Sequence, residues 1–144
     1  MIGSVLRMRL QLALNVRDLD TAVDFYSAMF GTEPAKRRPG YANFAIAEPP
    51  LKLVLFEAAE ADDSGFHHLN HLGVEVNDAA EVTAADQRLG QSGVETTGVE
   101  DAVCCFAEKT ETWAVSPEGA RWEWYVKTGD AEQIEHTSVS SSCC

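Results

Sequence analysis

Two side chains that could hold a metal ion lie at matching points of two similar segments. Gln11 opens the alternating stretch Gln11-Leu-Ala-Leu-Asn-Val, and His71 opens His71-Leu-Gly-Val-Glu-Val at an offset of 60 residues (71 − 11). In a strand, every second side chain shares a face, so the next residues on the face of Gln11 and His71 are Ala13 and Gly73. Both are small, which leaves room for a bound group.

A third donor, Glu123, lies between Trp122 and Trp124 in the last apolar segment. A carboxylate there is costly to bury unless it is paired or coordinates a cation. An amide oxygen, an imidazole nitrogen and a carboxylate oxygen resemble the three-residue set that holds non-haem Fe(II) and leaves positions open. The sequence therefore predicts one divalent metal held by Gln11, His71 and Glu123. The amide is a weaker donor than imidazole, so we expect weaker binding than by a set with two histidines.

Other interpretations of these residues compete with the metal site. A lone glutamine on a strand is usually a surface residue, and a lone histidine is more often structural than a ligand. The register of the repeat favours the metal site, because it marks both positions before their identities are considered. His67 and His68 are secondary rivals in the expected linker. A fourth ligand would be expected near Leu53, where leucine cannot bind metal.

The four cysteines form two adjacent pairs, Cys104–Cys105 and Cys143–Cys144. Adjacent cysteines are poorly placed to bond with each other, so free thiols that bind a soft ligand are one interpretation. Small buried apolar residues are the other. Neighbouring strand residues point to opposite faces, so two sulfurs can reach one atom only from a loop or bulge. We predict such a loop, mobile and including residues 100–107.

The elements that would position these residues repeat in the order β-α-β-β-β. For the first half, alternation, caps and breakers predict a strand at 10–16, a helix from Asp18 or Asp20 to Gly31, and strands at 34–37, 41–47 and 51–57. For the second half they predict a strand at 71–76, a helix from about 78 to 91, and strands around 94–97, 103–108, 112–116 and 121–127. The fold class is therefore α+β.

The 144 residues suit one domain at 1–130, with module one at about 9–57 and module two at about 69–128. Residues 58–70 are the expected linker, and the Cys-ended tail at 131–144 is expected to be disordered. The net charge of −12 disfavours nucleic-acid and membrane-surface partners. Arg7 and Arg9 interrupt the apolar N-terminal stretch, unlike in a signal peptide, so a cytoplasmic location is expected. The sequence is compatible with a homodimer but does not require one.

The paired modules resemble the vicinal-oxygen-chelate superfamily of glyoxalases, extradiol dioxygenases and bleomycin-resistance proteins. More narrowly, the chain is similar to the organoarsenical carbon–arsenic lyases, also labelled cadmium-induced proteins, from about residue 9 to 128. Three stretches carry this similarity, namely LQLALNVRDLDTAVDFYSAMFGTEPAKRRPGYANFAIAEPPLKLVLFE, LNHLGVEV, and the Cys104–Cys105 pair followed by WAVSPEGARWEWY.

The resemblance implies two βαβββ modules that form a shared curved sheet around a metal cavity. It further implies an enzyme that uses Fe(II) and O₂ to cleave the carbon–arsenic bond of methyl- or aryl-arsenite and release arsenite. Gln11, His71 and Glu123 match the metal ligands of the family, although other divalent metals can occupy such a site. Cys104 and Cys105 match the thiols that hold the trivalent organoarsenical.

Two other functions fit parts of the pattern. Vicinal cysteines also suit a protein that sequesters arsenic or cadmium without turnover, and such a protein does not need the three metal ligands. Glyoxalase-like or extradiol-dioxygenase chemistry uses the same fold, because fold does not fix function. Neither of those activities needs a Cys-Cys pair.

Overall fold

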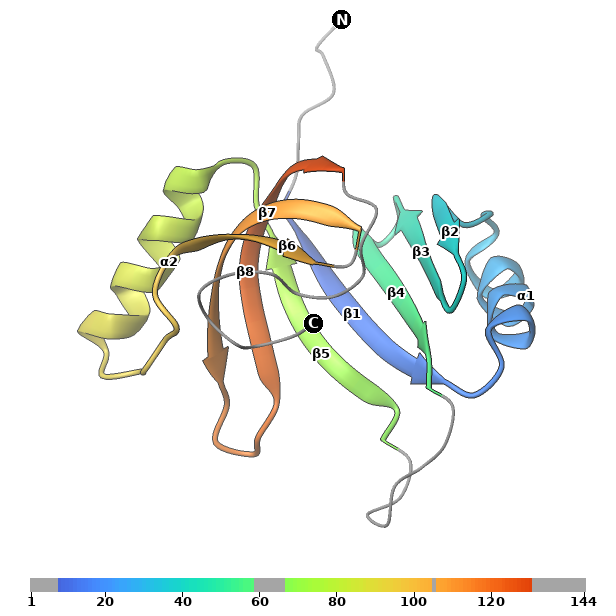
Figure 1. Ribbon diagram of the computed structural model, residues 1–144, viewed down its shortest axis with the longest axis horizontal. Coiled ribbons are helices and arrows are strands. Elements are labelled where there is room, and N and C mark those ends of the chain that lie inside the picture. Colours follow the sequence, from blue (N-terminus) through green and yellow to red (C-terminus); the bar gives the residue numbers. More distant parts are fainter. Residues whose placement is uncertain (1–7, 59–66, 105, 131–144) are drawn as a thin grey trace, which may run out of the picture. The chain divides into compact units, whose positions relative to one another are not determined.

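The computed structural model describes residues 8–58, 67–104 and 106–130 of the chain (Figure 1). In these residues it has eight strands and two helices. In chain order they are β1 (Arg9–Val16), α1 (Leu19–Phe30), β2 (Lys36–Arg38), β3 (Tyr41–Ile46), β4 (Leu51–Glu57), β5 (Leu69–Glu75), α2 (Ala79–Gln91), β6 (Glu100–Cys104), β7 (Ala107–Val115) and β8 (Arg121–Asp130).

The chain divides into two compact units, the first from Arg9 to Leu72 and the second from Gly73 onward. The boundary falls inside β5, so this strand contributes to both. The strand order is β2-β3-β4-β1-β5 in the first unit and β5-β8-β7-β6 in the second. Strands β1 and β4 pair in parallel, whereas β2–β3, β3–β4, β6–β7 and β7–β8 are antiparallel. The predicted α+β class with two βαβββ repeats is confirmed.

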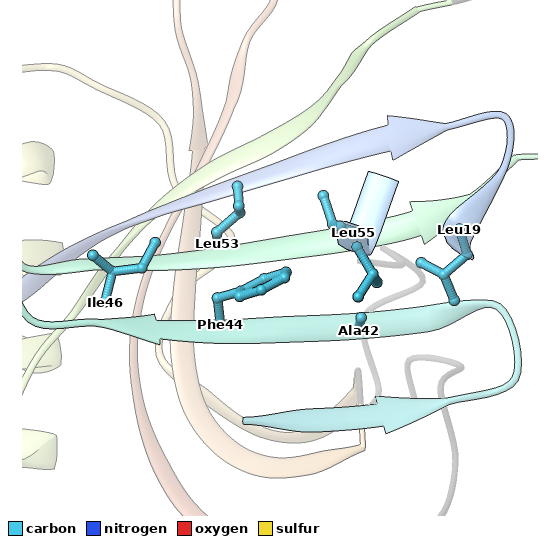
Figure 2. Close-up of a cluster of buried hydrophobic side chains, with 7 residues drawn as sticks. Leu19, Ala42, Phe44, Ile46, Leu53 and Leu55 are labelled. Atoms are coloured by element: carbon cyan, nitrogen blue, oxygen red, sulfur yellow. The ribbon is translucent and has the colours of Figure 1, made fainter. Parts of the chain in front are cut away.

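Alternate residues along the strands of the first unit face opposite sides of the sheet, and the buried side chains on one side are all apolar. In the β1–β4–β3 register, Leu12 pairs with Leu53, and Leu53 with Phe44. These side chains share the face covered by α1. Figure 2 shows how the buried cluster on this face converges; its members are Leu19, Val23, Ala42, Phe44, Ile46, Leu53 and Leu55.

The ends of α1 follow from its flanking residues. The Asp18 side chain accepts a hydrogen bond from the Thr21 amide at 3.1 Å, as an N-cap does. The Glu57 carboxylate accepts a further one from the Leu19 amide at 2.9 Å, which ties the helix to the end of β4. Gly31 closes the helix with φ of 63°, a left-handed conformation that glycine adopts without steric cost. The helix is therefore anchored at both ends over the apolar face.

Leu55→Ala is expected to destabilise the protein by about 2–5 kcal/mol, because Leu55 is fully buried and its removal leaves a cavity. Urea unfolding followed by circular dichroism measures the change. Met29→Ala, on the exposed part of α1, is the control and should shift the midpoint little. Equal effects of the two substitutions would contradict this packing.

The second unit repeats the arrangement with α2 packed on β7 and β8. Asp78 and Glu81 form a capping box at the start of α2, each side chain accepting from the backbone amide of the other. From the helix, the Asp86 carboxylate accepts a hydrogen bond from Thr112 Oγ1 at 2.9 Å. The Arg88 guanidinium lies 5.1 Å from the centroid of the Trp124 ring. These contacts define the helix-covered face of this unit.

Three predictions for the second half are wrong: a strand at 94–97, a loop at 100–107, and a single strand at 103–108, which the turn at Phe106 divides between β6 and β7. Residues 94–97 form no strand. The Thr97 amide donates to the Trp113 carbonyl at 3.0 Å, but the Trp113 amide donates to the Thr97 hydroxyl and not to the Thr97 carbonyl, so the ladder does not continue. Residues 100–104 are not a loop but strand β6, paired to β7 from Glu100–Glu111 to Cys104–Ala107. Cys104 is the last residue of that strand and precedes a tight turn, in which Phe106 has φ of 61°.

Candidate metal centre

Gln11 and His71 face each other in the first unit. Each is the third residue of its strand, β1 or β5, and their exposed fractions are 2 % and 1 %. Gln11 Nε2 lies 3.1 Å from His71 Nε2, within hydrogen-bonding distance. The structure thus brings together two of the three predicted metal ligands, and it buries both.

The face that carries this pair is the one turned away from α1. It holds all the buried polar side chains described in the first unit, namely Gln11, Asn43, Lys52 and His71. Register places Lys52 of β4 directly beside Gln11 of β1. The residue next to Gln11 on β4 is therefore Lys52, whereas Leu53 belongs to the apolar cluster of the opposite face. The residue that lies beside Gln11 near the expected position of a fourth ligand is thus the buried Lys52 and not Leu53.

Aromatic rings line the same face next to His71. The Phe56 ring lies 6.3 Å from the imidazole, and the Tyr41 ring meets Phe56 edge-on at 5.6 Å. Asn43 donates a hydrogen bond to the Tyr41 hydroxyl at 2.9 Å. These residues give the imidazole a dry, apolar side, which strengthens electrostatic interactions made there.

The second ring nitrogen of His71 contacts a chain of amides. His71 Nδ1 lies 2.7 Å from Asn70 Oδ1, and Asn70 Nδ2 donates to Asn15 Oδ1 at 3.0 Å. Asn15 Nδ2 then donates to the carbonyl oxygen of His67 at 2.8 Å. The side chains of His67 and His68, the rival ligands, are exposed. The main-chain carbonyls of both residues accept hydrogen bonds from Asn15.

Glu123 occupies the corresponding face of the second unit, turned away from α2. It is fully buried and pairs in register with Trp113 of β7. Lys109 Nζ lies 3.4 Å from Glu123 Oε1, and Lys109 is itself only 2 % exposed. The same ammonium lies 4.6 Å from the centroid of the Tyr125 ring. A buried carboxylate of this kind needs a cation beside it, and Lys109 supplies one.

Sequence reasoning missed Lys52, Lys109 and Glu111 on these faces. Glu111 is fully buried and accepts a hydrogen bond from Trp113 Nε1 at 2.5 Å. Alternation along β7 was the available signal, since Lys109, Glu111 and Trp113 are spaced by two. The expectation that lysine and glutamate stay exposed hides this signal.

Cys104 lies on the same face of the second unit as Glu123. It pairs with Ala107, and two residues further along β7 comes Lys109. Six residues of β7 (113 − 107) separate the partners of Cys104 and Glu123, which is roughly 20 Å of strand. Cys104 is 1 % exposed and forms a disulfide whose partner lies outside the described residues, where a free thiol was expected. Cys105, Cys143 and Cys144 also lie outside them, as does the tail predicted to be disordered.

Among the described residues, no three His, Cys, Asp or Glu side chains gather as a metal site would require. The predicted set contains only two residues of those types, because its third donor is an amide. Gln11 and His71 meet in the first unit, and Glu123 has Lys109 and Trp113 as neighbours in the second. Each predicted ligand is thus a buried polar residue on the helix-free face of its own unit.

Two βαβββ units, each with buried polar side chains on its helix-free face, define the structural class of this chain. Residues 9–123 match the family model described as the Glyoxalase/Bleomycin resistance protein/Dioxygenase superfamily. The chain belongs to this superfamily.

Relatives within the superfamily are named for arsenic and cadmium. The chain is 52 % identical over 136 residues to the "Trivalent organoarsenical cleaving enzyme" of Thermomonospora curvata, covering 94 % of this chain and 87 % of that protein. It is 47 % identical over 144 residues to the "Cadmium-induced protein CadI" of Mycobacterium tuberculosis, covering 94 % and 92 %. The resemblance to the organoarsenical-cleaving and cadmium-induced proteins is confirmed.

Solved structures agree in fold. The Mn(II)-bound glyoxalase from Novosphingobium aromaticivorans aligns with a TM-score of 0.60 at 18 % identity, over 88 % of this chain and 41 % of that one. Methylmalonyl-CoA epimerase from Mycobacterium tuberculosis aligns with a TM-score of 0.55 at 19 % identity, over 88 % and 92 %. Neither helix of the described part of the chain has the length and apolar character needed to cross a membrane.

Proposed function

We propose that this protein cleaves the carbon–arsenic bond of trivalent organoarsenicals and releases arsenite, in a reaction that depends on Fe(II) and O₂. The observation that supports this most is the buried Gln11–His71 pair, with its two terminal atoms 3.1 Å apart. The name of the relative that is 52 % identical supports the substrate class. Detoxification of methyl- or aryl-arsenite would be the biological result.

The residues present fit a divalent metal. His71 would offer an imidazole nitrogen and Gln11 an amide oxygen, and the two side chains end 3.1 Å apart, so one ion could accept both donors. Rotating the Gln11 amide exchanges its nitrogen and oxygen, which are interchangeable in shape, and turns the oxygen toward His71. In the proposal, Glu123 completes the set as its only anion, so the three residues neutralise half the charge of a dication.

Bound Fe(II) would supply the redox chemistry that O₂ requires. The residues of the chain position and shield the reactants. Phe56 and Tyr41 keep water from the imidazole. The Lys109 ammonium forms an ion pair with the Glu123 carboxylate and so fixes its position. Binding of a cation beside Glu123 would compete with that ammonium for the carboxylate.

Cys104 and Cys105 would hold the substrate. Two thiols react with the two hydroxyls of the trivalent arsenical: two As–S bonds form, two As–O bonds break, and the thiol protons leave with the hydroxyls as two waters. The carbon substituent stays on arsenic. The disulfide at Cys104 must first be reduced by a thiol reductant, which supplies two electrons and two protons and is itself oxidised to a disulfide; such thiols are abundant in the cytoplasm, the proposed location. Because roughly 20 Å of strand separates Cys104 from Glu123, we propose that the β6–β7 hairpin bends to bring the arsenical closer.

Anaerobic reconstitution tests the proposed function. The reduced full-length protein is loaded with Fe(II) and phenylarsenite, and O₂ is then admitted. We expect arsenite to appear only when Fe(II), O₂ and substrate are all present, as measured by chromatography coupled to arsenic-specific mass spectrometry. Recovery of intact phenylarsenite under these conditions would reject the proposal.

Gln11→His is expected to bind Mn(II) about tenfold more tightly, equivalent to about 1.4 kcal/mol, because imidazole is a stronger donor than an amide. Gln11→Leu, which has no donor, should bind more weakly than the natural protein. Titration calorimetry on the metal-free protein measures both. Unchanged affinity in Gln11→Leu would show that Gln11 is not a ligand.

A further inference from the structure

The hydrogen bonds behind His71 have a direction that one backbone atom determines. The carbonyl oxygen of His67 can only accept, so the amide group of Asn15 that faces it at 2.8 Å must be its NH₂. The oxygen of Asn15 then faces Asn70 at 3.0 Å and must accept from the NH₂ of Asn70. Neither amide can be reversed without placing two acceptors or two donors against each other.

The same direction reaches the imidazole. With its NH₂ given to Asn15, Asn70 presents its oxygen to His71 Nδ1 at 2.7 Å. An oxygen there accepts, so Nδ1 must carry the hydrogen. In the neutral ring, Nε2 is then left with its lone pair, and Nε2 is the nitrogen that faces Gln11 at 3.1 Å. We propose that Asn15 and Asn70 are positioning residues that hold His71 in the Nδ1–H tautomer and keep Nε2 available as a metal donor.

The hydrogen-bonded series from the His67 carbonyl through Asn15 and Asn70 to His71 and Gln11 is called the relay, and it starts at a main-chain atom. All five groups lie within the first unit, on β1, on β5 and on the residue pair just before β5. The backbone N–H of Asn15 also donates to the His68 carbonyl at 2.7 Å, so the two main chains are joined next to the side-chain bonds. A histidine ligand commonly gives its second nitrogen to an oxygen acceptor, which fixes both the tautomer and the ring orientation. Here two side-chain amides transmit that orientation from a main-chain carbonyl.

The inference rests on the proposed function only in taking His71 as a metal ligand. Its first test needs neither metal nor substrate. Metal-free, full-length protein labelled with ¹⁵N at histidine is studied at mildly alkaline pH by long-range ¹H–¹⁵N correlation, with His71 assigned from the spectrum of His71→Ala. We expect Nδ1 to appear as the protonated nitrogen and Nε2 as the unprotonated one. A protonated Nε2 with unprotonated Nδ1 would overturn the inference.

Variants separate positioning from mere packing. Asn70→Leu removes the acceptor and should shift His71 toward the Nε2–H tautomer and weaken Mn(II) binding roughly 10- to 100-fold. Asn15→Leu should change the tautomer and the Mn(II) affinity in the same direction but less, because Asn70 then loses the acceptor that fixes the direction of its amide. Asn15→Asp keeps an acceptor toward Asn70 and should retain the natural tautomer, although it loses the donor to the His67 carbonyl and should therefore lower stability in urea unfolding. Asn77→Leu, a matched substitution at an exposed site in the second unit, is the control.

The outcomes are separable. If Asn70→Leu and Asn77→Leu have the same tautomer and the same Mn(II) affinity as the natural protein, the positioning role is wrong. If Asn15→Asp loses the Nδ1–H tautomer as fully as Asn15→Leu, the relay direction is wrong. A protein that shows the expected tautomers and Mn(II) affinities but releases no arsenite would reject the proposed reaction and leave the relay standing.

Discussion

Glu123→Gln is expected to abolish arsenite release while arsenical binding stays close to that of the natural protein. Glutamine keeps the shape of the side chain but removes the only anion of the proposed ligand set. Loss of an outer partner of a metal ligand already costs about 10- to 100-fold in affinity, so loss of the anionic ligand should weaken Fe(II) binding by at least about 100-fold. Metal titration and arsenic speciation on the same preparation measure the two effects.

The buried ion pair makes a second control necessary. In Glu123→Gln the Lys109 ammonium, 3.4 Å from the carboxylate it loses, stays buried without a counter-charge. Breaking a buried pair in this way costs about 3–5 kcal/mol, which could lower activity through unfolding alone. The double variant Glu123→Gln/Lys109→Met removes both charges, and methionine packs well on the Tyr125 ring. We expect it to recover stability in urea unfolding but not Fe(II) binding.

These results also decide between catalysis and sequestration. A protein that only sequesters arsenic through thiols would bind phenylarsenite equally well with or without Glu123 and would release no arsenite in either form. If the stable double variant turns over like the natural protein, Glu123 is not part of the metal centre. Glu108→Gln, at an exposed position of the same strand pair, tests whether any change of a carboxylate in this region has the same effect.

Cys104→Ser is expected to weaken binding of phenylarsenite roughly 100-fold or more, since the loss of one of two thiolates converts chelation into single attachment. The measurement is anaerobic titration without metal, so that binding is separated from turnover. The protein is reduced with a phosphine, because a dithiol reductant would itself bind arsenic. Oxidised natural protein should bind as poorly as the variant, because the Cys104 sulfur is then occupied by the disulfide.

Cys143→Ser is the matched control for this experiment. It makes the same chemical change outside the Cys104–Cys105 pair, and it should leave phenylarsenite binding unchanged in the reduced protein. An equal loss in Cys143→Ser and Cys104→Ser would assign arsenic capture to a different pair of sulfurs. Natural affinity in Cys104→Ser would remove Cys104 from the substrate site.

Local sequence signals predicted most of the fold. The caps Asp18 and Asp78 and the break at Gly31 placed both helices. The alternation of 10–16 and the break at Pro49–Pro50 placed the inner strands of the first unit. These features depend on residues close in the chain. The prediction failed at 94–97, where threonine hydroxyls bond Asp86 and the Trp113 amide, because such partners are distant in sequence.

The candidate site was predictable in part. The repeated strand segments that begin at Gln11 and His71 indicated two donors, and the structure places their terminal atoms 3.1 Å apart. The register between strands was not predictable, since it is set by turns and pairing rather than by composition. A shift of one residue distinguishes Lys52, beside Gln11, from Leu53 in the apolar cluster. Lys109 could not be foreseen either, because its burial depends on a carboxylate 14 residues away.

In the first unit, the residues that pack under α1 and the residues that surround Gln11 and His71 occupy different positions of the same strands. On β1 the even-numbered residues pack under α1, whereas on β4 the odd-numbered ones do. A mutant library on the opposite face, at Asn43, Ala45 and Lys52, would therefore vary the surroundings of Gln11 and His71 without changing the apolar cluster under α1. Selection for new metals or substrates could begin at these three positions.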